Sequence, residues 1–173
     1  IDDFNRESLA IEVDTSLPSL RVIRVLEKLI ALRGCPANIR CDNGPEFISH
    51  KLEQWCNDES RKISLQFIQP GRPMQNAYIE RKNGSMRREL LNAYLFYNLA
   101  EVRSMSEEWR IDYNTERPHK SLCYLSPLKY AELKSSEAAL STPASENHLQ
   151  IAAQPVVDKA GNTEKKITFE NSN

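Results

Sequence analysis

Two short apolar runs with a helical pattern between them constrain the fold of this chain most. Residues 37–41 and 63–67 are each bounded by turn-forming residues, and apolar side chains alternate along the second run. Residues 46–57, between them, carry an apolar helical face. That face consists of Phe47, Ile48, Leu52 and Trp55. A helix between two strands predicts an α/β fold in which a sheet has crossover connections.

Other segments extend this pattern. Apolar residues alternate over 9–13 and predict another half-buried strand. Ser19–Arg33 has the wide apolar arc of a helix packed on a sheet, and Gly34 follows as its stop. A further helix is predicted from its core stripe of Val102, Met105, Trp109 and Tyr113. The chain therefore alternates strands and helices, as one α/β domain of this length would.

Asp42 follows the predicted strand at residues 37–41 directly. Asn43, Gly44 and Pro45 then break the strand. A carboxylate at the C-terminal end of an α/β strand points into the crevice where such sheets bind ligands. The alternative is a plain Asp-Asn-Gly turn with no function.

Glu80 lies on a helix predicted to begin near Met74 or Gln75, after a run with two prolines and a glycine. One stripe of this helix is apolar, and it consists of Ile79, Met86, Leu90 and Ala93. A second stripe presents Asn76, Glu80, Asn83 and Arg87. From residue 72 to residue 89, five Lys/Arg less two Glu give +3, whereas the whole chain is −1. A basic patch on a near-neutral chain favours a polyanionic partner, although a solvated helix face would look similar.

Three runs carry a resemblance to a known family. They are CDNGPEF at residues 41–47, IQPGRPMQNAYIERKNGSMRREL at 68–90 and YNTERPHKSLCYLSP at 113–127. In this order they resemble the catalytic core of bacterial insertion-sequence transposases of the OrfB type, which are DDE enzymes of the retroviral-integrase superfamily. The resemblance covers roughly residues 1–133. Cys123 stands where that family commonly has glycine, so the turn there is expected to differ.

The resemblance implies an RNase H-like mixed sheet with flanking helices, and two divalent metal ions (Mg²⁺ or Mn²⁺) held by three carboxylates. Asp42 matches the second carboxylate and Glu80 the third. The first lies on a strand upstream of the segment that matches Ile1–Asp3. The resemblance therefore implies that the first strand or strands and one metal ligand are missing, and that catalysis is impaired. Carboxylates without His or Cys suit Mg²⁺, and two such ions stabilise the attacking and leaving oxygens at phosphorus.

DNA is the implied partner, both as mobile-element ends and as integration target, bound by a homo-oligomer. The residues expected to contact it lie around the two carboxylates and in the YNTERPH run. They are Asn43, Arg72, Gln75, Asn76, Arg81, Lys82, Asn83, Arg87, Arg88, Arg117, His119 and Lys120. Arg and Lys contacts to phosphate position DNA without reading its sequence. For Arg117 and His119 the alternative is a proline-terminated helix with local hydrogen bonds.

The composition of the chain also predicts where the protein is located and how the chain divides into a core and a tail. No run is apolar and long enough to span a membrane, no signal-peptide pattern is visible, and the four cysteines lack C-x-x-C spacing. A bacterial cytoplasmic protein without a membrane partner is expected, with Cys41 and Cys56 reduced in the core. Residues 1–133 form the expected core, and 134–173 an expected polar, largely disordered tail with a weak hairpin around 156–169.

Two other functions fit the same residues. A fragment that keeps the basic helix but lacks a metal ligand could bind DNA or full-length transposase subunits without catalysis. It could also be an inert relic of a decayed element. DNA integration, recombination and transposition nevertheless remain the leading prediction, because both matched carboxylates and the basic helix occur together.

Overall fold

The two predicted strands form a small parallel sheet, and a helix crosses between them. The structure, a computed structural model, describes residues 1–140 of the 173. β1 (Asn38–Cys41) pairs with β2 (Ser64–Phe67), and α2 (His50–Asn57) connects them. Parallel pairing puts both carboxyl ends at one edge, so the residues after β1 and β2 lie together. Within the described residues the sheet has only these two strands, whereas the sequence predicted a larger mixed sheet.

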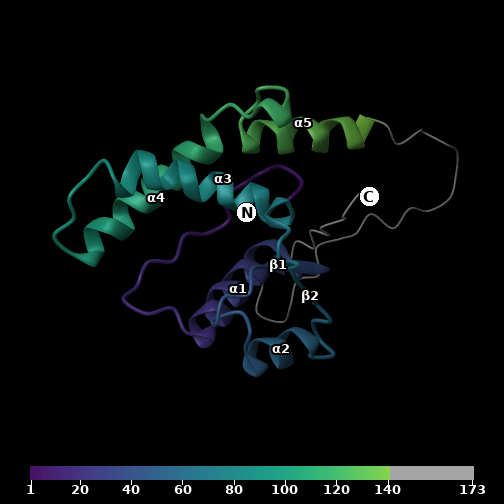
Figure 1. Ribbon diagram of the computed structural model, residues 1–173. Helices are drawn as coiled ribbons and strands as arrows, with labels where there is room; N and C mark the ends of the chain where they lie inside the picture. The colour runs from purple at the N-terminus through teal and green to yellow at the C-terminus, as the bar shows by residue number, and fades with distance from the viewer. Residues whose placement is uncertain (141–173) are drawn as a thin grey trace, which may run out of the picture.

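α1 (Ser19–Arg33) and α2 pack on one face of this sheet (Figure 1). The helix predicted at these residues for α1 is confirmed, and Gly34 ends it at a φ of 86°, a conformation that glycine adopts without steric cost. The fully buried part of this core is Ile23, Leu52, Cys56 and Ile63. Burial raises the pKa of the Cys56 thiol, and that of Cys41 to about 11, so both are protonated core residues as predicted.

The opposite face of the sheet is polar. Ile39 and Leu65 pack into the core with α1 and α2. Because successive side chains alternate between faces, Arg40 and Gln66 project to the other side. Buried parallel sheets are usually apolar on both faces, so this polar face is exceptional and needs a different explanation from packing.

The remaining helices lie on the other side of the sheet in Figure 1. A 3₁₀ turn, η1 (Pro73–Asn76), leads into α3 (Ala77–Met86), which continues into the π-helical turn η2 (Arg87–Leu91). α4 (Leu99–Thr115) follows, capped by Asn98, and then η3 (Lys120–Leu122) and α5 (Pro127–Leu140). α4 carries its predicted core stripe, in which Tyr113 is buried.

The π-helical turn changes the predicted apolar stripe of the Glu80 helix. The Asn92 amide donates to the Arg87 carbonyl at 2.8 Å, five residues back, which adds one residue to that turn. Met86 and Leu90 are buried as predicted. Ala93 is exposed, so its assignment to the stripe was wrong: the helix ends at Leu91 and the extra residue shifts the phase.

Two further element predictions were wrong in part. Residues 9–13 are not a strand, because α4 side chains take the carbonyls beside them: Asn114 and Arg110 bind Ser8 O, and Arg103 Nε binds Val13 O at 3.0 Å. The helix predicted from residue 46 begins at His50 instead. Phe47 and Ile48 amides both donate to Gly44 O at 2.9 Å in a tight turn, which leaves Ile48 exposed.

α5 crosses the expected boundary between core and tail. It runs from Pro127 to Leu140, so residues 134–140 are helical rather than the start of a disordered tail. Lys134 pairs with Glu137 across one helical turn at 2.7 Å. The expected hairpin around 156–169 lies outside the described residues, and the division at residue 133 stays a prediction.

Candidate metal and nucleic-acid site

Asp42 is exposed immediately after β1. Its Oδ1 accepts a hydrogen bond from the Gly44 amide at 3.0 Å, which forms the Asx turn considered from the sequence. A Cβ on Gly44 would lie 3.0 Å from that same oxygen, so glycine lets the turn close on the carboxylate. Within residues 1–140 no ion pair engages Asp42. The carboxylate is thus oriented by its own turn and left available to a ligand.

Glu80 stands exposed on α3, also without an ion pair or hydrogen bond in the described residues. Asn83 and Arg87, on the same predicted stripe, are exposed as well, and Asn76 is half-buried. The helix therefore presents amide, carboxylate and guanidinium on a face that its own fold does not use.

Polar contacts connect the elements that carry the two carboxylates. Arg40 NH1, near the end of β1, donates to the Gln75 carbonyl at 3.3 Å just before α3. Gln75 Oε1 accepts from the Gln69 amide at 2.8 Å and closes the loop between β2 and η1. Asn43 Nδ2 donates to Ile68 O at 3.2 Å, across the ends of the two strands. Asn43 and Gln75 therefore hold the loops of the site together, and the DNA contacts expected of them stay a prediction.

The donor set fits hard divalent ions in part. Two free carboxylates are the oxygen ligands that Mg²⁺ and Mn²⁺ favour. However, no three His, Cys, Asp or Glu side chains in the described part of the chain are grouped so as to hold a metal ion. Asp42 and Glu80 could each ligate such an ion.

Most of the predicted basic contacts are on the surface. The exposed members are Arg72, Arg81, Arg87, Arg88 and Lys120. Arg88 also donates to Ser85 Oγ at 3.4 Å. None of the five forms an ion pair within the described residues, so each is available to donate hydrogen bonds to a phosphate.

Lys82 differs from its neighbours because it is buried. Only 6% of its surface is exposed. Burial, and secondarily the charge of Arg110, lower its pKa to about 8. Its position on α3 turns it away from the exposed stripe and toward α4, so the expected phosphate contact does not fit this geometry.

Arg117 and His119 are engaged internally. Arg117 pairs with Glu89 and stacks over Trp109 and Tyr113, at 5.7 and 5.4 Å from the ring centroids. His119 meets Tyr113 edge-on at 5.0 Å, and burial, with the charges of Arg117, Arg6 and Arg81, lowers its pKa. These contacts favour the structural alternative raised for the YNTERPH run and leave Lys120 as its exposed cation.

Sequence reasoning missed Arg6, Arg40 and Tyr78. Arg6 stacks on the Tyr78 ring at 3.4 Å, and Arg40 projects from the polar sheet face toward α3. A signal existed for Arg40, since a charged residue at an alternating position of a strand must face something other than an apolar core. Nothing in the sequence pairs Arg6 with a residue so distant along the chain.

Comparison with known proteins identifies the family. Two family profiles, both described as "Integrase core domain", match residues 1–73 and 61–127 and so together cover the elements described above from α1 to η3. The chain belongs to the integrase core domain family. The resemblance seen in the three motif runs is therefore confirmed at the level of the family.

Relatives of this integrase core come from mobile elements and retroviruses. The chain is 44% identical over 131 residues to the "Insertion element IS407 uncharacterized 31.7 kDa protein" of Burkholderia multivorans, covering 76% of the chain and 47% of that protein. It is 42% identical over 131 residues to the IS476 39.2 kDa protein of Xanthomonas euvesicatoria, covering 76% and 37%. The Gag-Pro-Pol polyprotein of human T-cell leukemia virus 2 matches at 35% identity over 77 residues, 44% of the chain and 5% of the polyprotein. The chain thus spans less than half the length of these relatives.

A solved structure has a similar fold. It is a simian T-cell lymphotropic virus intasome in complex with the PP2A regulatory subunit B56 gamma, with a TM-score of 0.53 and 21% identity. The match covers 92% of this integrase core and 52% of the other chain. In residues 1–140 no helix has the length and apolar character needed to cross a membrane.

Proposed function

We propose that this integrase core domain is the catalytic core of an insertion-sequence transposase with an RNase H-like fold. It would cleave DNA at the ends of a mobile element and join those ends to target DNA. The observation that carries the proposal is a pair of exposed carboxylates that form no ion pair within residues 1–140. Asp42 ends a strand and Glu80 stands on an adjoining helix, and the Arg40–Gln75 hydrogen bond ties those two elements together.

The proposed roles of the residues follow from their chemistry. Asp42 and Glu80 would hold Mg²⁺ or Mn²⁺ together with a third carboxylate outside the described residues. When bound, two such ions stabilise the oxygens that attack and leave phosphorus. Arg81, Arg87 and Arg88 would bind phosphates and set the register of the DNA on α3 and η2. The Gly44 amide donates to Asp42 Oδ1, and this hydrogen bond would orient the carboxylate for ligation.

The partners and the location belong to the same proposal. The two insertion-element relatives support DNA as substrate and the bacterial cytoplasm as location. The intasome similarity concerns the fold, and it is consistent with a homo-oligomer assembled on DNA. A strand-transfer enzyme that joins two ends benefits from two copies of its site, since each copy can process one end.

Metal-dependent strand transfer by the complete insertion-element protein tests this function. Asp42→Asn and Glu80→Gln should each lower the rate of strand transfer at least about a hundredfold. Removing a metal ligand lowers the rate more than removing a residue that only orients a ligand. Glu59→Gln is the matched control, since Glu59 is exposed away from the site and should leave the rate unchanged. Equal rates in all three variants would contradict the assignment.

A second candidate function is DNA binding without catalysis. Two observations favour it: residues 1–140 lack a three-carboxylate group, and the exposed arginines on α3 and η2 have no ion-pair partners there. In that case DNA affinity would survive Asp42→Asn and Glu80→Gln unchanged while strand transfer would be absent from the parent protein too. Anisotropy of a labelled duplex, measured beside the transfer assay, separates the two functions.

A further inference from the structure

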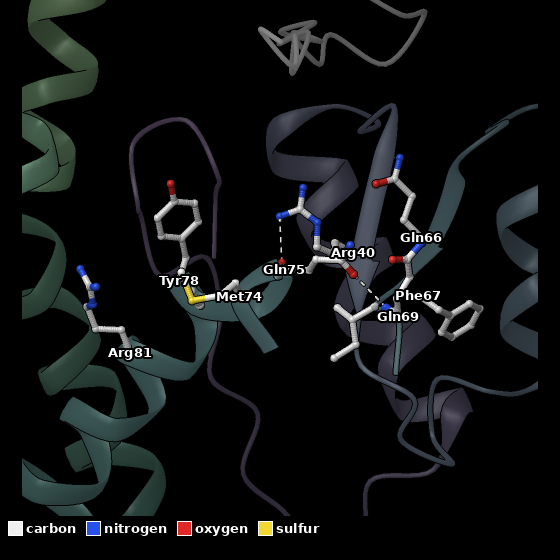
Figure 2. Close-up of a pocket in the computed structure, with 10 residues that line it drawn as sticks. Arg40, Gln66, Phe67, Gln69, Met74, Gln75, Tyr78 and Arg81 are labelled. Carbon is white, nitrogen blue, oxygen red and sulfur yellow. Dashed lines mark hydrogen bonds between the residues drawn. The ribbon is translucent and has the colours of Figure 1, made fainter. Parts of the chain in front are cut away.

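A cavity of about 540 Å³ lies between the polar sheet face and the start of α3 (Figure 2). Arg40 and Gln66 line it from the two strands, and Tyr78 and Arg81 line it from α3. Its volume lies within the range of small-ligand pockets. Arg81 directly follows Glu80, so the cavity is lined by the same helix that carries the proposed metal ligand.

Two apolar or aromatic side chains on the α3 side of this cavity are open to solvent. They are Met74, which is 83% exposed, and Tyr78, which is 40% exposed. Amide side chains of Gln66 and Gln69 stand on the opposite wall. Stacking surfaces beside hydrogen-bonding amides are the groups that recognise the face and the edge of a nucleobase.

The Tyr78 ring is held in place by Arg6. The Arg6 guanidinium lies 3.4 Å from the ring centroid, a close cation–π contact. Arg6 itself has a φ of 64°, an unfavourable left-handed conformation that only a well-fixed turn maintains. The turn thus places Arg6 beside Tyr78, and the Arg6 guanidinium covers one face of the Tyr78 ring.

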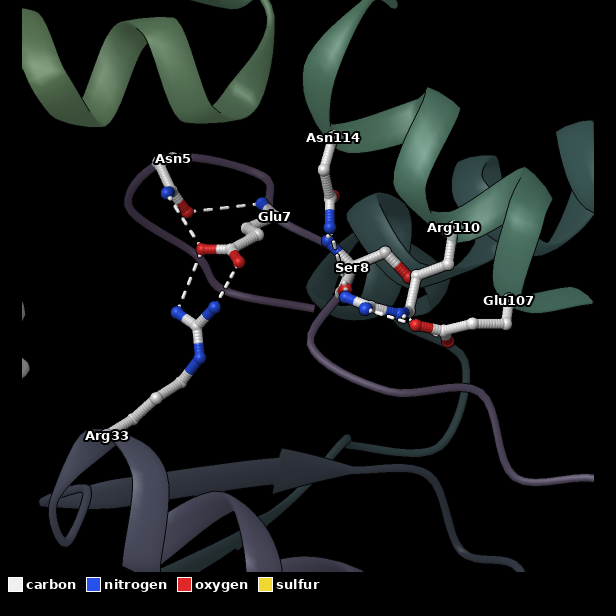
Figure 3. Close-up of polar contacts among 7 residues, drawn as sticks. All are labelled: Asn5, Glu7, Ser8, Arg33, Glu107, Arg110 and Asn114. Carbon is white, nitrogen blue, oxygen red and sulfur yellow. Dashed lines mark hydrogen bonds and ion pairs between the residues drawn. The ribbon is translucent and has the colours of Figure 1, made fainter.

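Buried polar contacts fix the turn that carries Arg6 (Figure 3). Asn5 and Glu7, on either side of Arg6, are buried and hydrogen-bond each other. Glu7 pairs with Arg33 of α1, and the Ser8 amide donates to Asn114 Oδ1 of α4 at 2.8 Å. The turn is thus anchored to helices on both sides of the molecule.

The charge of the cavity is positive. Arg81 lines the cavity without a carboxylate partner in the described residues, whereas Arg40 pairs with Asp3 at 2.9 Å. An unpaired guanidinium in the same wall as an aromatic ring attracts an anion that is joined to a flat ring. A nucleotide has this combination, whereas a paired duplex presents its phosphates and keeps its base faces stacked.

We propose that this cavity binds one unpaired nucleotide of the DNA strand, with the base against Tyr78 and Met74 and a phosphate on Arg81. The inference rests on the proposed function for the identity of the polymer as DNA. It adds a subsite that distinguishes single-stranded from duplex DNA, on the helix that carries Glu80. Cleavage produces a strand end, and such an end can unpair and enter.

Binding of single-stranded and duplex DNA to the full chain, measured by anisotropy in EDTA, tests the subsite. Tyr78→Leu should weaken binding of a single-stranded oligonucleotide about tenfold, since one base–aromatic stack is lost, and should leave duplex binding within about twofold. Tyr78→Phe keeps the ring and should bind like the parent. Tyr97→Leu makes the same change at an exposed tyrosine outside the cavity and serves as the control.

A fluorescent 2-aminopurine base in the oligonucleotide reports stacking directly. Its fluorescence would not respond to Tyr78 if that residue had only a structural role. Its fluorescence should be quenched on the parent and on Tyr78→Phe, but not on Tyr78→Leu. The proposal is overturned if the parent shows no quenching, or if Tyr78→Leu weakens single-stranded and duplex binding alike. The binding assay contains EDTA and therefore does not depend on metal. Either negative result would overturn the subsite without bearing on metal-dependent strand transfer. Conversely, a failed strand-transfer assay would not bear on the subsite.

Discussion

Lys82 lies on the helix of the proposed site yet is buried beside α4. Burial, with the charge of Arg110, lowers its pKa to about 8, against about 10.4 in an unfolded chain. Between these values the unfolded chain binds more protons than the folded one, so the free energy of unfolding rises with pH across that window. Below about pH 8 Lys82 is charged in both states, so the folded state bears the full free-energy cost of burying that charge.

Replacing Lys82 with Met should therefore stabilise the domain. We expect the free energy of unfolding at pH 7 to rise by about 2 kcal/mol, because the apolar side chain fills the same space without a charge. The gain should shrink as the pH approaches 10. Urea unfolding at pH 7 and pH 10 measures both values, and Lys28→Met, on an exposed position of α1, is the control. A pH-independent gain would contradict the lowered pKa.

Cys123 has a backbone conformation that residues with a Cβ atom disfavour. Its φ is 54°, in the left-handed region that glycine occupies at little cost. Cys123→Gly should raise the free energy of unfolding by about 1 kcal/mol, whereas Cys123→Ala should not, because alanine keeps the Cβ. Thermal unfolding of the two variants makes the comparison. Equal stability of both variants would show that the turn carries no strain at this residue.

At the scale of elements, sequence periodicity predicted the helices α1 and α4 and both strands, because each buries a regular apolar face. Periodicity gave a wrong prediction where tertiary contacts, rather than the local sequence pattern, determine the backbone conformation. Residues 9–13 alternate like a strand, but side chains from α4 bind the backbone at both ends of the segment, at the Ser8 and Val13 carbonyls. The π-helical turn after Met86 depends on packing that no local pattern records.

The two contacts between Ser8 and Asn114 hold this segment against α4. Asn114 is buried, accepts from the Ser8 amide at 2.8 Å and donates to the Ser8 carbonyl at 3.1 Å. Asn114→Ala leaves the buried Ser8 amide without a partner and should lower the free energy of unfolding by about 2 kcal/mol. Thr115→Ala, which removes only a hydroxyl bonded to Ile111 O, should cost much less. Denaturant unfolding distinguishes them, and equal losses would contradict this anchoring.

The candidate site was predictable only in part, for the same physical reason. Asp42 and Glu80 stand exposed because a strand end and a polar helix stripe place them there, and both features are local. The burial of Lys82 and the internal pairing of Arg117 depend on how α4 packs, which local sequence does not encode. Arg6 meets Tyr78 only because a turn anchored at Arg33 and Asn114 brings it there.

At the scale of the whole molecule, the chain supplies one side of the proposed catalytic centre. Its core beneath the sheet, formed by Ile23, Leu52, Cys56 and Ile63, supports β1 and so the position of Asp42. The second group of helices carries Glu80 and the exposed arginines. Polar contacts from the N-terminal turn to α1 and α4 connect the two groups. The account requires these halves to hold Asp42 and Glu80 around shared metal ions.

Calorimetric titration of Mn²⁺ tests that requirement most directly. The 173-residue chain would be compared with the complete insertion-element protein, which would add the third carboxylate. The account predicts tight binding by the complete protein, weak binding by the shorter chain, and loss of binding in the complete protein on Asp42→Asn or Glu80→Gln but not Glu59→Gln. Mn²⁺ bound equally well by the Asp42→Asn and Glu80→Gln variants would contradict it.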